Sequence, residues 1–278
     1  MKDYEKSIVE YYGQIDLADN IMAAFKRAGK TIETHEDTAS FDAFHIRGRD
    51  VTRELAQLAG LQKGMKVLDL GCGVGGSART LAAEFGCYVT GIDLVEEYCR
   101  TATLLTERVG LSHMVTFEHG DMVELPFDEQ TFDVAWTEHT IMNIPDKVRL
   151  FREVRHVLRS RGLFVLHEAC AGSVSPPHFP VPWAGDSTIS FLTTPQQLLD
   201  MLKDAGFEKL QWRDVTTPSL EWFRQLNASK PSRTREKRPG LGLSLLMGKS
   251  AAEKSKNLFR NLEEHRIVVV QGVMRLKA

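Results

Sequence analysis

The chain has 278 residues, of which 42% are hydrophobic and 26% are charged, and its formal net charge is −2. This composition is typical of a globular protein with a sizeable core, and the charge excludes a general attraction to nucleic acid or anionic lipid. No apolar run approaches the ~18 residues of a membrane span, no signal peptide begins the chain, and the four cysteines form no C-x-x-C pair, so we expect a cytoplasmic protein with reduced thiols.

The first 62 residues are predicted to form a helical cap, with helices over 4–12, 17–28 and 49–60. From residue 63 onwards, strand-like and helical segments alternate, which predicts a parallel sheet covered by helices on both faces. The expected strands are 66–70, 88–92, 115–118, 132–136 and 163–167. The expected helices between them are 77–85, 96–109 and 147–158.

The alternation ends after the fifth strand. Residues 172–193 contain many helix and strand breakers and are expected to form an ordered lid loop. A helix at 195–205, a strand at 207–215, a helical insertion at 218–264 and a last, antiparallel strand at 266–276 complete an expected three-layer α/β sandwich with a seven-stranded, mostly parallel sheet. The basic run KPSRTREKR at 230–238 is expected to be a solvated loop, with a nucleic-acid patch as the alternative.

A glycine-rich segment follows the first predicted strand. Gly71 to Gly76 fit G-x-G-x-x-G, the pattern of a dinucleotide site, but Asp69 would repel a pyrophosphate and suits an ammonium group. Asp93 ends the second strand, where it is placed to bind ribose hydroxyls, and Asp121 follows the third strand, where an adenine amine would lie. These acids predict a nucleoside with an amino acid tail, S-adenosylmethionine, while helix-cap or turn roles for single acids remain alternatives.

Residues 64–170 resemble the class I S-adenosylmethionine-dependent methyltransferases, because 69–75 match D-x-G-x-G-x-G and 120–122 match a Gly-Asp-Met turn. The turn at 158–162 differs from that family at Arg161, where a glycine is usual. The resemblance implies a Rossmann-like fold, S-adenosylmethionine as cofactor and no metal. It assigns cofactor contacts to Asp69, Gly71, Gly73, Gly75, Asp93, Leu94, Asp121, Met122 and Glu138.

Three further segments, 42–48, 142–147 and 182–186, resemble the sarcosine/dimethylglycine-type N-methyltransferases of bacteria and algae. That resemblance implies a small-molecule acceptor, with an amine as one candidate and O-, C- or S-methylation as alternatives. A nicotinamide oxidoreductase and a non-catalytic cofactor-binding regulator are rival functions. The motifs of base methylation are missing, so neither a nucleic acid nor a membrane is an expected partner, and the oligomeric state cannot be read from the sequence.

Several side chains are candidates for the acceptor site. His139 follows the fourth strand and is the candidate catalytic base, with packing against the adenosine as the alternative. Ordinary core packing or helix-start roles are the alternatives for the candidate substrate-binding residues, which are Tyr11, Tyr12, His45, Arg47 and Trp183.

Overall fold

The computed structural model describes residues 3–228 and 241–278, so the basic run 230–238 lies outside the described residues. Its sheet consists of β1 (Lys66–Leu70), β2 (Tyr88–Asp93), β3 (Val115–His119), β4 (Phe132–Glu138), β5 (Leu158–Ala171), β6 (Phe207–Asp214) and β7 (Ile267–Leu276). The strand order is β3-β2-β1-β4-β5-β7-β6. The first five strands run parallel, and β7 is antiparallel to both β5 and β6, which confirms the predicted seven-stranded, mostly parallel sheet.

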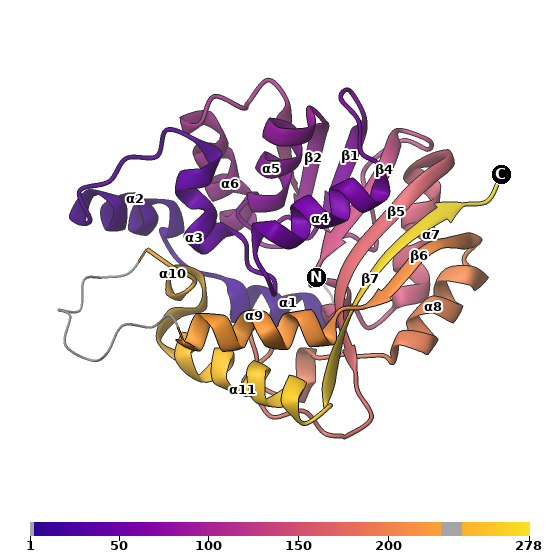
Figure 1. Cartoon of the computed structure of the whole chain (residues 1–278). Coiled ribbons are helices and arrows are strands. Elements are labelled where there is room, and N and C mark those ends of the chain that lie inside the picture. The colour runs from indigo at the N-terminus through magenta and orange to yellow at the C-terminus, as the bar shows by residue number, and fades with distance from the viewer. Residues whose placement is uncertain (1–2, 229–240) are drawn as a thin grey trace.

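Helices cover both faces of the sheet (Figure 1). On one face, α4 (Arg49–Ala59) and α5 (Gly76–Phe85) pack their apolar side chains against β1, β2 and β4. On the other face, α7 (Lys147–Val157) and α8 (Pro195–Asp204) bury leucine, phenylalanine and valine side chains against β4 and β5. A parallel sheet requires this double cover, because each of its strands presents apolar side chains on both sides.

Local signals in the sequence determine several helix ends. Thr194 and Gln197 form a capping box at the start of α8, and Pro195 occupies its first position. Asp146 caps α7 by accepting a hydrogen bond from the backbone N–H of Arg149 at 2.9 Å. The helix α6 (Glu96–Arg108) connects β2 to β3 and packs beside both.

The predicted turn at 158–162 is instead part of β5, which begins at Leu158 with a bulge against β4. Arg161 adopts a φ of +62° there, in the left-handed region that favours glycine. The expected turn therefore lies within the start of β5, and its left-handed backbone falls at Arg161, the position where the resemblance predicts a glycine.

The expected N-terminal cap divides into two parts. The helices α1 (Asp3–Tyr12), α2 (Leu17–Arg27) and α3 (Ala39–Asp42) lie over the carboxyl ends of the strands, whereas α4 packs on the sheet face. Much of the predicted insertion is helical, as α9 (Thr216–Ala228), α10 (Ser244–Met247) and α11 (Ala251–Glu263). Figure 1 shows α9 and α11 running side by side beneath α1, and the lid loop 172–193 beside α11.

A buried ion cluster fastens this cap to the sheet domain. The carboxylate of Asp42 accepts hydrogen bonds from Arg79 at 2.6 Å and from Arg49 at 2.8 Å, and all three side chains are at most 3% exposed. Burial alone would raise the pKa of Asp42, but the two guanidinium groups lower it below its usual value. Arg79 lies in α5, directly after the glycine loop, so the cluster fixes the cap against that loop.

We expect Asp42→Ala to lower the free energy of unfolding by about 3–5 kcal/mol, because it leaves two buried guanidinium groups without their counterion. Urea denaturation followed by circular dichroism measures this loss. Asp50→Ala is the matched control, since Asp50 is 79% exposed and pairs with Arg53 at 3.4 Å. A loss at Asp42 no larger than at Asp50 would contradict the structural role of the cluster.

Candidate functional site

The candidate site is a cavity at the carboxyl ends of β1, β2 and β4, between the glycine loop and α1. Its lining comes from the cap, the glycine loop, the ends of these strands and α10. Strand order reverses here, because β2 and β4 flank β1, and ligands of open α/β sheets bind at such a switch point.

The glycine loop brings its backbone close to the cavity. Gly71 has a φ of +71°, and a side chain there would collide with Thr140. Gly73 has a φ of +53° and donates its backbone N–H to Asp93 at 2.9 Å. Gly75 does not line the cavity, and a Cβ at this position would meet Phe117 and Arg79. The first two glycines are thus placed for contact with a ligand, whereas Gly75 forms the turn into α5.

Asp69, in β1, lines the cavity and is 3% exposed. Burial and the neighbouring carboxylates of Glu138 and Asp93 raise its pKa well above the usual value. Its Oδ2 atom has no hydrogen-bond partner among the described residues. An ammonium group at this position would satisfy the oxygen and restore the charged form of Asp69.

Two more acids follow β2 and β3. Asp93 accepts backbone N–H groups of Gly73 and Val95, each at 2.9 Å, and carboxylate lone pairs remain for further donors. Asp121 accepts the backbone N–H of Val123 at 3.0 Å and the hydroxyl of Tyr4 at 2.8 Å. The structure therefore brings the three predicted acids to one cavity, and Leu94 and Met122 line it with apolar surface between them.

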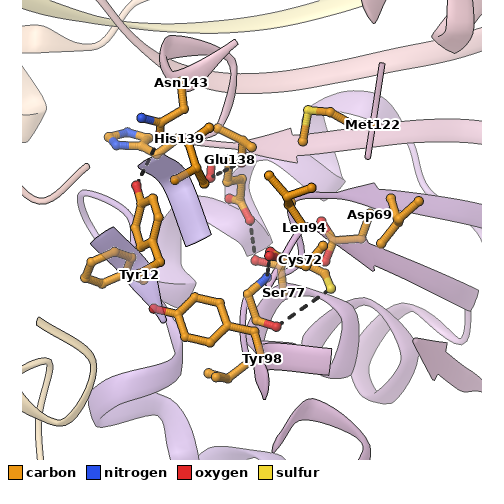
Figure 2. A pocket seen from close by; sticks show the side chains of 18 of the residues that line it. Tyr12, Asp69, Cys72, Ser77, Leu94, Tyr98, Met122, Glu138, His139 and Asn143 are labelled. Carbon is orange, nitrogen blue, oxygen red and sulfur yellow. Dashed lines mark hydrogen bonds between the residues drawn. The ribbon is translucent and has the colours of Figure 1, made fainter. Parts of the chain in front are cut away.

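Glu138 ends β4 and joins four parts of the chain at the base of the cavity. Its carboxylate accepts hydrogen bonds from Thr52 of α4 at 3.1 Å, from Ser77 of α5 and from the indole of Trp136 at 3.1 Å. His45 approaches the same carboxylate at 3.5 Å. Figure 2 shows Glu138 pointing toward Ser77. These donors already occupy several of the lone pairs of the carboxylate. Glu138 therefore holds α4, α5 and β4 together in addition to lining the cavity.

Three histidines cluster beside Glu138. The ring of His139 lies 4.7 Å from that of His167 and 6.4 Å from that of His45, measured between centroids. Burial, together with His45, lowers the pKa of His139 to about 3. The imidazole of His139 is thus neutral at physiological pH, and it is a weak acceptor for a proton. This finding corrects our expectation of a histidine with an ordinary pKa near ~6.5.

Hydrogen bonds connect the cap and the loop 172–193 through Asn143, which lines the cavity. Tyr12 lines the cavity and donates its hydroxyl to the side-chain oxygen of Asn143 at 2.9 Å (Figure 2). The amide nitrogen of Asn143 donates to backbone carbonyls of the lid at Trp183 (3.0 Å) and Ile189 (2.7 Å). Tyr11 donates to the carbonyl of Val181 at 2.7 Å.

The candidate substrate residues fall into two groups. Tyr12 and His45 line the cavity, whereas Tyr11, Arg47 and Trp183 do not. Arg47 pairs with Glu54 at 2.5 Å, and Trp183 is 1% exposed with its indole N–H bonded to Ser190 at 3.0 Å. Trp183 thus belongs to the core of the lid, where it cannot form the acceptor cage expected from the sequence.

Sequence reasoning did not assign roles to several residues that line the cavity. Phe44 and Asn143 lie inside segments whose resemblance to other proteins was noted, so a motif contained them without indicating their contacts. No local pattern marks the others, because long-range packing brings them to the cavity: Tyr4, Ile8, Ser77, Tyr98 and Leu246.

The fold and the three acids define an α/β protein that binds a nucleoside-bearing ligand at the switch point of its sheet. In agreement, residues 68–166 match the family model described as "Methyltransferase domain". No helix in the described part of the chain is both long and apolar enough to cross a bilayer.

Among curated proteins, the chain is similar to a sarcosine/dimethylglycine N-methyltransferase of Halorhodospira halochloris, with 31% identity over 54% of each chain. It is 32% identical to a sterol 24-C-methyltransferase of Aspergillus fumigatus, over 63% of this chain and 48% of that one. The chain thus spans about half the length of these curated relatives. The solved structure of the [4+2]-cyclase SpnF has the same fold, with a TM-score of 0.68, 23% identity and coverage of 100% and 98% of the two chains.

The histidine cluster predicts how stability depends on pH. His167 is fully buried, and burial lowers its pKa well below the usual value, so it stays neutral in the folded protein and gains a proton when the chain unfolds in acid. Between pH 7 and pH 5, this difference lowers the free energy of unfolding by about 2 kcal/mol. His167→Gln lacks this proton uptake. We therefore expect its free energy of unfolding to fall by about 2 kcal/mol less than that of the wild type when the pH is lowered from 7 to 5.

Urea denaturation at pH 7, 6 and 5 measures this difference, and comparison with wild type removes contributions from other groups such as Glu168, whose pKa is raised to about 7 by burial. His113→Gln, at an exposed position, is the control. A difference between His167→Gln and wild type that does not change with pH would contradict a neutral, buried His167.

Proposed function

We propose that the protein transfers a methyl group from S-adenosylmethionine to a small-molecule acceptor. The observation that carries the proposal is the set of acids at or just beyond the carboxyl ends of three successive strands around one cavity, Asp69, Asp93 and Asp121. Asp69, whose buried Oδ2 has no hydrogen-bond partner among the described residues, suits the cofactor's ammonium, Asp93 suits ribose hydroxyls, and Asp121 suits the adenine amine. A dinucleotide phosphate would instead meet the negative charge of Asp69.

When bound, S-adenosylmethionine supplies an activated methyl group on a sulfonium, and the protein's task is to orient the two reactants and exclude water. Gly71 and Gly73 allow close approach of the loop, while Tyr12 and Asn143 close the cavity above it. His139 presents a neutral imidazole whose Nε2 has no partner among the described residues, so its role is to orient the acceptor by a hydrogen bond. Proton removal from an amine acceptor then occurs in solvent before binding.

The relatives' names support methylation of small molecules but differ in the acceptor atom, which is nitrogen in one case and carbon in the other. Among these acceptors we retain an amine as a candidate, with O-, C- and S-methylation as alternatives. The fold alone does not specify methyl transfer, since SpnF is a cyclase. Four free, buried cysteines support a reducing, cytoplasmic location for the reaction.

We expect S-adenosylhomocysteine to raise the melting temperature and NAD to leave it unchanged. Asp93→Ala should weaken binding of S-adenosylhomocysteine by roughly 1–3 kcal/mol, the scale for losing hydrogen bonds to a charged group. Isothermal titration calorimetry measures both ligands, with Asp128→Ala at an exposed position as the control.

An equal response to NAD would favour the nicotinamide oxidoreductase over the methyltransferase. Conversion of S-adenosylmethionine to S-adenosylhomocysteine in an acceptor screen separates catalysis from cofactor binding alone. A protein that binds the cofactor but transfers no methyl group to any acceptor in the screen would support the regulatory alternative.

A further inference from the structure

We infer that the acceptor is a molecule with an apolar body and no anionic group. This inference names the acceptor class for the methyl transfer proposed above and therefore rests on it. It depends on two features of the described residues that line the cavity. The first is a set of apolar side chains in addition to the cofactor-binding acids, and the second is the distribution of charged groups.

The apolar part of the cavity is built from segments far apart in the sequence. The cap contributes Ile8, Tyr12 and Phe44, the segment after β4 contributes Ile144, and α10 contributes Leu246. Apart from the hydroxyl of Tyr12, which is already bonded to Asn143, these side chains offer no polar group. An acceptor that fills this space therefore gains mainly by burying apolar surface.

Acidic and basic side chains are unevenly distributed around the cavity. Five carboxyl groups line it, and none of its described lining residues is lysine or arginine. The carboxyl groups belong to Asp42, which is paired with Arg49 and Arg79, and to Asp69, Asp93, Asp121 and Glu138. An anionic acceptor would thus lose its hydration without a lysine or arginine among the described lining residues to replace it.

The cationic side chains nearest to the cavity are already paired. Arg49 and Arg79 share the carboxylate of Asp42, and Arg47 pairs with Glu54. The single charge of Asp42 thus balances one of the two charges of Arg49 and Arg79, Glu54 balances that of Arg47, and none of these arginines lines the cavity. Moving one of them toward an acceptor would separate it from its carboxylate.

The remaining cationic groups around the site lead to the same conclusion. Lys147 donates its ammonium to the carbonyls of Ile144 at 2.7 Å and Phe191 at 2.6 Å, which holds it in the loop after β4. His45 lies 3.5 Å from Glu138, so a proton on its ring would be balanced by that carboxylate. Arg47, a candidate substrate-binding residue in the sequence, is paired with Glu54 and does not line the cavity.

Pairs of compounds that differ by one anionic group test this inference on the full-length protein, in which the basic run 230–238 is present. N-methylphenethylamine is compared with N-methylphenylalanine, and geraniol with geranyl monophosphate. Calorimetry measures the binding of each compound to the protein saturated with S-adenosylhomocysteine. We expect the member without the anionic group to bind at least tenfold more tightly in both pairs.

Equal or tighter binding of the anionic members would overturn the inference, and so would failure of both non-anionic members to bind. Binding of S-adenosylhomocysteine is measured first. If it fails, the proposed function fails and this inference falls with it, whereas normal cofactor binding with a preference for anions refutes the inference alone.

Variants that add a positive charge to the cavity provide a second, independent test of the inference. Phe44 is half-buried and lines the cavity, so Phe44→Arg should place an unpaired cation there and strengthen binding of N-methylphenylalanine and geranyl monophosphate at least tenfold. Ile15→Arg adds the same charge at a position that is 87% exposed and should leave both affinities at their wild-type values. Equal gains in the two variants would indicate a general charge effect and contradict the assignment to this cavity.

Discussion

The carboxylate of Glu138 is the interaction on which the geometry of the site depends. It lies at the end of β4 and accepts hydrogen bonds from Thr52 of α4 and Ser77 of α5, so one buried acid fixes two helices against the same strand. A buried carboxylate is stable only when its lone pairs are satisfied, and these donors come from segments far apart in the sequence. The position of the glycine loop, which directly precedes α5, therefore depends on tertiary contacts as well as on its own glycines.

Buried polar side chains also hold the segments around the cavity together. Asn143 uses its side-chain oxygen for Tyr12 of the cap and its nitrogen for two carbonyls of the lid, so one amide connects both covers. Asp42 fastens the cap from below through two guanidinium groups. Buried polar networks of this kind hold a unique arrangement because each unpaired member would cost free energy. The cap is thus held by polar contacts to α5 and to Asn143, and the loop 172–193 by contacts to Asn143 and Tyr11.

The sequence was sufficient for the order of strands and helices along the chain and for placing Asp69 and Asp93 at or next to the carboxyl ends of their strands, because such positions follow directly from local periodicity. It was misleading for Trp183 and Arg47, since a side chain in a loop can pack inward or form an ion pair, and periodicity does not distinguish these cases. The sequence also could not predict the lowered pKa of His139, because burial and the neighbouring His45 cause it. Tyr4 reaches the site only through packing over a separation of 117 residues, and no local motif indicates such a contact.

The hydrogen bond from Tyr4 to Asp121 has a thermodynamic consequence. Asp121 accepts this hydroxyl from α1, and the same carboxylate lines the cavity in which an adenine amine is proposed to bind. A ligand at this position therefore contacts the same anchor as the first helix of the chain, and the two binding events become linked. By reciprocity, if the bound ligand stabilises the docked position of α1, the docked helix increases the binding free energy of the ligand by the same amount. The N-terminal helix would then act as a component of the binding equilibrium as well as a cover over the site.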